Sequence, residues 1–268
     1  MRARAAGARW GEAAKDLSDG VSRVSLWSAL GWSDVRQRYS GSLLGSFWIT
    51  ANLALMAGGL TFVFAAPLGL GAGRYAAYVT VGLVLWHFVQ GALNEASNLF
   101  VAASETIRNA PMPLSVQALR LVWRNLIVLA HNALIVPLVL LWAGIAPSGL
   151  WTLVPALLLV TATTFCVALL LGLLGARFRD VPQVVANGLQ LMFFLTPVFW
   201  LPQTVGGARD WFVAANPIFA FIDIVRAPLI GEAPAPTSWP VALGVAAAAA
   251  LGAAAAFGAW RSRIAYWI

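Results

Sequence analysis

Amide and aromatic side chains recur at helical spacing in the apolar stretch that follows Arg177. The polar face of this stretch comprises Gln183, Asn187, Gln190 and Phe194. Spacings of three and four residues place these side chains on one side of a predicted helix. Amides in hydrocarbon need hydrogen-bonding partners, so this face should meet other helices or a wet cavity. A pathway lined with amides and rings would suit a sugar, because sugars stack on rings and hydrogen-bond to amides.

Two earlier apolar stretches carry the same kinds of side chain. One has Trp48, Asn52, Gly59 and Phe62, and the next has Tyr78, Gly82, Trp86 and Gln90. The predicted lining of a pathway therefore comprises Trp48, Asn52, Phe62, Tyr78, Trp86, Gln90, Asn187, Gln190 and Phe194. Ordinary packing of helices through bulky residues and glycines would give the same pattern, so the sequence leaves both interpretations open.

Groups that could carry out catalysis or bind a metal are scattered along the chain. The histidines, His87 and His131, have no second ligand at helical spacing, which favours hydrogen bonding between helices over a metal site. Cys166, the single cysteine, excludes a disulfide within the chain. The sequence shows no pair of acidic residues that would indicate an enzyme. The phosphate-binding loop needs a lysine after glycine, and the only lysine, Lys15, follows Ala14, so any Mg-ATP should be bound by another chain.

The composition is that of an integral membrane protein. Sixty per cent of the residues are hydrophobic and 10% are charged, against roughly a quarter charged in soluble proteins. Lysine and arginine total 17 against 10 acids. The cations lie between the apolar stretches and at the ends of the chain, which excludes one basic face and argues against nucleic acid as a partner.

Six apolar stretches have about the length that a helix needs to cross roughly 30 Å of hydrocarbon. They cover residues 47–66, 75–93, 119–143, 150–176, 184–201 and 239–260. With both ends inside, only Arg74, Arg209 and Arg226 of the 17 cations lie outside, which satisfies the positive-inside rule. We expect an all-α protein that passes several times through the bacterial cytoplasmic membrane, with both termini in the cytoplasm.

The remaining segments are predicted to flank this six-helix domain, residues 47–268. Residues 1–21 have no apolar core and should form a mobile cytoplasmic arm. Residues 22–46 predict an amphipathic helix in the membrane interface, and a solvated charged helix is the alternative. Trp27 and Trp32 would then lie at headgroup depth, beside lipid phosphates bound by Arg36 and Arg38. Residues 202–238 are too apolar for a free loop, so we expect short re-entrant helices capped near Asn216-Pro217.

Several motifs resemble those of one family of transporters. They are Asp34-Val-Arg-Gln-Arg-Tyr39, Leu44-Gly-Ser-Phe-Trp48, Phe178-Arg-Asp-Val181, Phe194-Leu-Thr-Pro-Val198, Asn216-Pro217, Arg226-Ala-Pro-Leu229 and Arg263-Ile-Ala-Tyr-Trp267. The chain is similar to the membrane subunits of type-2 ABC exporters for lipid-linked polysaccharides such as O-antigen and teichoic acid. It departs from the family at Ser46, where proline is common.

The resemblance implies a homodimer of permeases bound to two copies of a separate ATPase, with a channel for a lipid-linked glycan at the dimer interface. It also implies coupling to the ATPase through the inner segments that contain Glu105 and Arg108, and Arg179 and Asp180, and an outer gate in residues 203–229. An exporter of a small drug or lipid is the alternative within the transporters. A membrane-embedded enzyme that processes glycans is disfavoured by the lack of paired acids, and an inert scaffold by the amides inside the spans.

Overall fold

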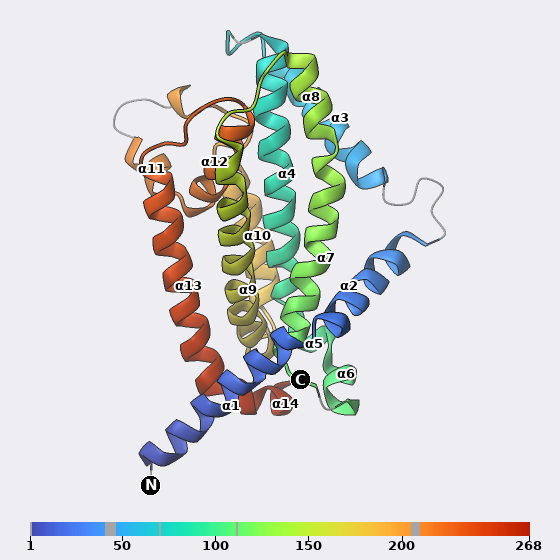
Figure 1. Ribbon diagram of the computed structural model, residues 1–268, viewed down its shortest axis with the longest axis vertical. Helices are drawn as coiled ribbons and strands as arrows, with labels where there is room; N and C mark the ends of the chain where they lie inside the picture. The colour runs from blue at the N-terminus through green and yellow to red at the C-terminus, as the bar shows by residue number, and fades with distance from the viewer. Residues whose placement is uncertain (1, 41–46, 70, 111, 205–209) are drawn as a thin grey trace.

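The computed structural model describes residues 2–40, 47–69, 71–110, 112–204 and 210–268, and within these ranges the regular structure is entirely helical. The predicted all-α class is therefore confirmed. Most of the long helices run along the long axis of the molecule, and both termini lie at the same end (Figure 1). Four parts of predicted segments fall outside the described ranges: Met1 of the arm, residues 41–46 of the interface helix, Pro111 of the coupling segment and residues 205–209 of the outer hairpin.

Five segments of the described chain are long and apolar enough to cross a membrane. They are α3 (Phe47–Phe64), α4 (Ala72–Ala96), α7 with α8 (Ser115–Ala133 and Ile135–Ala143), η1 with α9 (Leu150–Thr152 and Leu153–Arg177), and α13 (Ser238–Trp260), which is extended by η4 (Arg261–Arg263) and α14 (Ile264–Trp267). These segments correspond to five of the six predicted spans.

Helix α10 (Val181–Leu195) corresponds to the remaining predicted span and is shorter than expected. Its 15 residues reach about 22 Å, less than the roughly 30 Å of a hydrocarbon core. The predicted continuation to residue 201 is wrong, because Thr196 is already extended at the residue before Pro197, where proline disfavours the helical conformation. The sequence had indicated that Pro197 bends or ends this helix, and the helix ends there.

Helix α4 is the central element of the bundle. It contacts α3, α7, α8, α9, α10 and α12, and its residues from Tyr75 to Trp86 are buried. A helix that is apolar on all sides is expected in such a position. At Gly82 a Cβ atom would lie 2.8 Å from the carbonyl oxygen of Val198, so glycine lets the turn after α10 reach the α4 backbone.

The predicted span 119–143 is interrupted in the structure. Helix α7 ends at Ala133 and α8 begins at Ile135. Pro137 explains the break, because proline lacks an N–H and its ring clashes with the carbonyl four residues earlier. The two helices still run on toward the same end of the molecule (Figure 1).

Helix α13 packs along α9, as its alanine-rich sequence predicted. A Cβ atom added to Gly252 would lie 3.5 Å from the Leu170 side chain, which is an ordinary van der Waals distance. Lower on α9, Gly175 lies so close to the carbonyl oxygen of Ser97 that a Cβ atom would be 1.7 Å away. Only glycine therefore lets α9 meet the turn after α4.

The predicted mobile arm is a helix, α1 (Arg2–Ser22), and its described side chains are held against the bundle. The ring of Trp10 lies on Gly258 of α13, where a Cβ atom would be 2.9 Å from the indole. The buried carboxylate of Asp16 accepts hydrogen bonds from the backbone N–H groups of Leu114 and Ser115 at 3.0 and 2.9 Å. The prediction of mobility is therefore wrong for this part of the arm.

Short helices close the two ends of the bundle. At the end that carries both termini lie α5 (Leu99–Ala102), α6 (Ser104–Asn109) and α14, and α2 (Val24–Tyr39) runs obliquely from this end along the side of the bundle (Figure 1). Toward the opposite end lie α11 (Asp210–Ala215) and α12 (Pro217–Leu229), preceded in sequence by η2 (Pro202–Thr204). Helices were predicted in this last segment, and the cap near Asn216 is confirmed, because its Oδ1 accepts the Phe219 N–H at 3.0 Å.

Candidate functional site

The amide face of α10 points away from the rest of the chain. Asn187, Gln190 and Phe194 are exposed, as is Gln183, whose Nε2 donates to Oδ1 of Asn187 at 3.0 Å. Leu189 on the other side is the buried residue of this helix. The predicted amide face is therefore exposed, together with the apolar side chains of Val184 and Leu191, and its role as the lining of a pathway stays a prediction. Exposed amides at membrane depth require partners outside this chain.

Helix α3 also presents its predicted site residues outward. Trp48 and Asn52 are exposed, and 89% of Phe62 is exposed. On the opposite side, Leu53 and Ala57 pack into the core. A single chain therefore leaves two helices, α3 and α10, with ring and amide side chains that it does not cover.

The predicted lining residues of α4 lie elsewhere. Trp86 is 2% exposed, its Nε1 donates to Oε1 of Gln90 at 3.0 Å, and its ring lies 5.3 Å from that of Phe193. The prediction that Trp86 lines a pathway is contradicted by this burial, and the packing interpretation holds for this ring. Tyr78 is also buried, with its hydroxyl 3.2 Å from the carbonyl oxygens of Pro197 and Trp200. Periodicity could not separate core from lining on a helix that is surrounded on all sides.

A network of charges joins α2 to the C-terminal part of α4 and the N-terminal part of α7. Asp34 accepts from Arg120 Nε and Arg124 Nη1, each at 2.7 Å. Glu95 pairs with Arg124 Nη2 and with Arg38 Nη2, each at 2.7 Å. Arg38 therefore forms an ion pair within the chain, and because 49% of its side chain is exposed, its contact with lipid phosphate stays a prediction.

Of the other predicted interface residues, one packs against the bundle and two are exposed. Trp27 packs edge-on against Trp123 of α7, with ring centroids 5.8 Å apart. Trp32 and Arg36 are exposed. Gly31 brings α2 close to α7, since a Cβ atom there would lie 2.9 Å from the Trp123 ring. Helix α2 is thus packed on the bundle along one side, and Trp32 and Arg36 remain available to a membrane surface.

The charge network sets the pKa values of its outer members. Burial raises the pKa of Asp34, but the hydrogen bonds and charges of Arg120 and Arg124 outweigh burial and hold it below its ordinary value of 3.8. Burial lowers the pKa of Arg38, and the hydrogen bond and charge of Glu95 raise it above its ordinary value. Both groups are therefore charged throughout the physiological range.

We expect Asp34→Asn to lower the midpoint of thermal unfolding by several °C at neutral pH, because it leaves two partly buried arginines short of a counter-ion. The lowered pKa means that the wild-type carboxylate stabilises the fold fully above its ordinary pKa of 3.8, and that this contribution is lost as pH falls through the folded-state pKa below it. Thermal unfolding of both proteins across pH 7 to 3 measures this. A difference between them that stays constant over the whole range contradicts the assignment.

The predicted coupling residues gather at the end of the molecule that carries the termini. Glu105 and Arg108 are exposed on α6, and Arg108 Nη2 donates to the carbonyl oxygen of Ile268. Arg179 and Asp180 are exposed at the corner between α9 and α10. Helix α14 contacts both α6 and α9. The two charged segments are therefore linked through the C-terminus into one surface.

The two histidines bond to their own helices. Nδ1 of His87 lies 2.8 Å from the carbonyl oxygen of Leu83, and Nδ1 of His131 lies 3.0 Å from that of Ile127. Among the residues that the structure describes, there is no group of three or more His, Cys, Asp or Glu side chains that could hold a metal ion.

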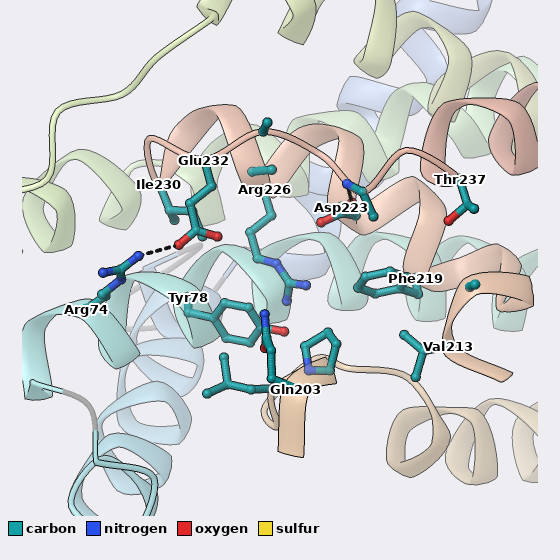
Figure 2. Close-up of a pocket in the computed structure, with 16 residues that line it drawn as sticks. Arg74, Tyr78, Gln203, Val213, Phe219, Asp223, Arg226, Ile230, Glu232 and Thr237 are labelled. Atoms are coloured by element: carbon teal, nitrogen blue, oxygen red, sulfur yellow. Dashed lines mark hydrogen bonds and ion pairs between the residues drawn. The ribbon is translucent and has the colours of Figure 1, made fainter. Parts of the chain in front are cut away.

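A cavity of about 860 Å³ lies at the end opposite the termini, between α4, α12 and the segments that flank α11 and α13. We call it the outer pocket, and its lining residues are Arg74, Tyr78, Leu201, Pro202, Gln203, Val213, Ala214, Phe219, Asp223, Arg226, Ala227, Ile230, Glu232, Ala233, Ala235 and Thr237 (Figure 2). Arg226 extends between the rings of Tyr78 and Phe219 (Figure 2), and its guanidinium lies 3.8 Å from the centroid of Tyr78. Its Nη1 donates to the carbonyl oxygen of Pro197 at 2.8 Å.

A model of the ABC-2 type transporter family matches residues 25–230. This range contains most of α2 and all of the helices from α3 to α12. The chain belongs to the ABC-2 type transporter family. The resemblance found in the motifs is thereby confirmed, and the chain is a membrane subunit of a transporter.

Curated relatives in this family carry more specific names. The chain is 26% identical over 194 residues to an O-antigen export system permease protein RfbA of Klebsiella pneumoniae, covering 70% of this chain and 74% of the relative. It is 25% identical over 200 residues to a protein of the same name from Myxococcus xanthus, covering 72% and 76% of the two chains.

Two features of this ABC-2 transporter chain were not found from the sequence as sites. Asp34 and Arg226 appeared there only as parts of family motifs, and Arg226 also as an outer cation. The charges of Arg120 and Arg124, four residues apart on the predicted third span, were a signal for a shared acidic partner. No local signal places Arg226 against Tyr78, because the two residues come from helices α12 and α4, far apart in the sequence.

Proposed function

We propose that this chain is the permease subunit of an ATP-driven exporter that moves a lipid-linked polysaccharide resembling O-antigen out of the cytoplasm across the bacterial inner membrane. The observation that carries this proposal is the similarity to O-antigen export permeases over about three quarters of their length. The exposed amides and ring of α10 support it, because a sugar polymer can stack on rings and hydrogen-bond to amides.

Deletion of the gene in its own host tests this function. We expect surface polysaccharide to disappear and the lipid-linked precursor to accumulate inside, with both effects reversed by the full-length gene on a plasmid. Immunoblots of surface polysaccharide and chromatography of the precursor measure the two pools. Normal surface polysaccharide in the deletion strain contradicts the proposed cargo, and loss of resistance to a small toxic compound would favour export of small molecules.

A homodimer is the assembly that we infer for the exporter. The exposed faces of α3 and α10 contain amides, which are unfavourable in lipid, beside aromatic rings. Two-fold pairing of two permeases would cover these faces with the same faces of the second copy. A channel between them would hold two copies of the α10 stripe. Helix α10 would then cross the membrane together with residues 196–201, because non-helical backbone is tolerated where it lines a cavity.

The energy source in this proposal is a separate ATPase that binds Mg-ATP, present in two copies. The chain has no phosphate-binding loop of its own. We infer that the ATPase docks on the surface formed by α6 and the corner between α9 and α10, because the exposed charges of Glu105, Arg108, Arg179 and Asp180 lie there. The contact of α14 with α6 and α9 would transmit a displacement between them.

The proposed orientation places both termini in the cytoplasm, as the charge distribution favours. With Cys166 replaced by serine, we expect Asn109→Cys on α6 to be protected from a membrane-impermeant thiol reagent in intact spheroplasts. Ser148→Cys in the loop after α8 should be labelled. Both positions are exposed in the structure, and permeabilised cells show that each cysteine can react. The reverse labelling pattern contradicts the orientation.

A further inference from the structure

Arg226 is a buried cation without an acidic partner among the side chains that the structure describes. It is 1% exposed, and no described carboxylate lies within 4.0 Å of it. Its described polar contacts are the carbonyl oxygen of Pro197, to which Nη1 donates, and the side chain of Tyr78, although a guanidinium has five N–H donors. Buried charges are normally paired, because removing them from water is costly.

The two acids that line the same pocket are committed to other groups. Oδ2 of Asp223 accepts from the backbone N–H of Ala235 at 2.7 Å and from the hydroxyl of Ser238 at 2.6 Å, at the start of α13. Glu232 pairs with Arg74 at 2.7 Å (Figure 2). Among the described residues, the charge of Arg226 is therefore offset by the carbonyl oxygen of Pro197 and by the ring of Tyr78.

The surroundings of Arg226 fix its guanidinium at the floor of a space large enough for a ligand. The Tyr78 and Phe219 rings lie 3.8 and 5.9 Å from it, and the cavity has a volume of about 860 Å³. Arg74 lies at the rim of the same cavity with 67% of its side chain exposed. A planar guanidinium held in this way matches the oxygens of a phosphate group.

We propose that the outer pocket binds a phosphate group, with Arg226 as the buried contact and Arg74 as the contact at the rim. Binding would draw Arg74 from Glu232, an exposed pair of small net value. It would also place an anion against Arg226, which has no acidic partner among the described side chains. Two sources carry this chemistry: the phosphate of a lipid headgroup, including that of a lipid-linked cargo, and free phosphate. The proposal depends on the proposed export function only if the occupant is the lipid-linked cargo.

Ligand-dependent thermal unfolding tests the site on the full-length chain, purified in a maltoside detergent that contains no phosphate. Inorganic phosphate and dioctanoyl phosphatidate are the two probes. We expect both to raise the unfolding midpoint of the wild type. Arg74→Gln should weaken binding about tenfold, which corresponds to the loss of one charged contact. Arg226→Lys keeps the charge but loses the planar fork, so it should weaken binding at least as much.

The matched control is Arg263→Gln, an exposed arginine at the opposite end of the molecule, which should bind both probes like the wild type. Tighter binding of phosphatidate than of phosphate identifies a lipid as the occupant, and equal binding identifies the free anion. No stabilisation of the wild type by either probe overturns the proposal, as does unchanged binding in Arg74→Gln and Arg226→Lys. This experiment does not measure export. A negative result for phosphate binding therefore leaves the proposed export function standing, and a negative result for export leaves the phosphate site standing.

Discussion

Asp16→Ala is expected to lower the free energy of unfolding by about 3–5 kcal/mol, the usual cost of removing one partner from a buried ion pair. The Asp16 side chain is fully buried. Nε of Arg261, at the end of α13, donates to its Oδ2 at 2.8 Å, and Nη2 of Arg261 forms an ion pair with the same oxygen at 2.8 Å. The carboxylate also accepts the N–H groups of Leu114 and Ser115, which begin α7. The substitution leaves a charged guanidinium and two helix N–H groups without their acceptor.

The matched control is Glu12→Ala on the same helix. Glu12 is 65% exposed and its carboxylate lies 3.9 Å from Arg261, so its removal should cost little. Chemical denaturation of the purified chain, followed by tryptophan fluorescence, measures both variants. Asp16→Asn should fall between them, because its amide oxygen can accept some of these hydrogen bonds. Equal losses in Asp16→Ala and Glu12→Ala contradict a specific role for the buried carboxylate.

The role of Asp16 explains why the N-terminal arm could not be predicted correctly. Helix caps are read from sequence when the capping residue directly precedes the helix. Here the carboxylate that accepts the first N–H groups of α7 comes from about a hundred positions earlier. Residues 1–21 mix small apolar residues with charges and have no apolar core, so their composition indicated a solvated arm. The docking depends on single contacts that composition does not record.

The periodicity of α10 and α3 predicted their faces because each helix has one side on the bundle and one side free. The amide face of α10 and the exposed Phe62 of α3 follow that pattern. On α4 the same reasoning failed for Trp86, since this helix has neighbours on all sides and its rings are core residues wherever they fall. Periodicity identifies a face and does not identify what covers it.

The ends of helices near Pro197 and Asn216 could be predicted from the local sequence, whereas contacts between segments distant in the sequence could not. Pro197 marked the end of α10, and Asn216 before Pro217 marked the start of α12, because both signals act within a few residues. The approach of Arg226 to Tyr78 and the pairing of Asp34 with Arg120 and Arg124 depend on how whole helices pack. The first contact lines the outer pocket, and the second attaches α2 to the bundle.

Replacing the exposed face of α10 is expected to have the largest effect on transport. We expect the triple variant Asn187→Leu, Gln190→Leu and Phe194→Ala to reduce export of polysaccharide on the order of a hundredfold. This follows from about 1 kcal/mol for a stacked ring and about 1 kcal/mol for each amide hydrogen bond. The three side chains are exposed, so the fold of the single chain should survive their removal. Surface polysaccharide and cytoplasmic precursor, measured in the deletion strain, report the effect.

The control for this variant removes the same kind of exposed bulk from faces that carry no amides. Leu158→Ala on α9 and Leu251→Ala on α13 change side chains that are 65% and 73% exposed, and we expect both to export normally. Protein levels in the membrane are matched by immunoblot before export is compared. If the α10 variant were impaired but no longer formed dimers in crosslinking, the face would serve assembly and would not contact the cargo. Equal export by the α10 variant and the leucine controls would instead show that the face is ordinary packing surface, and the pathway would have to run along another part of the chain.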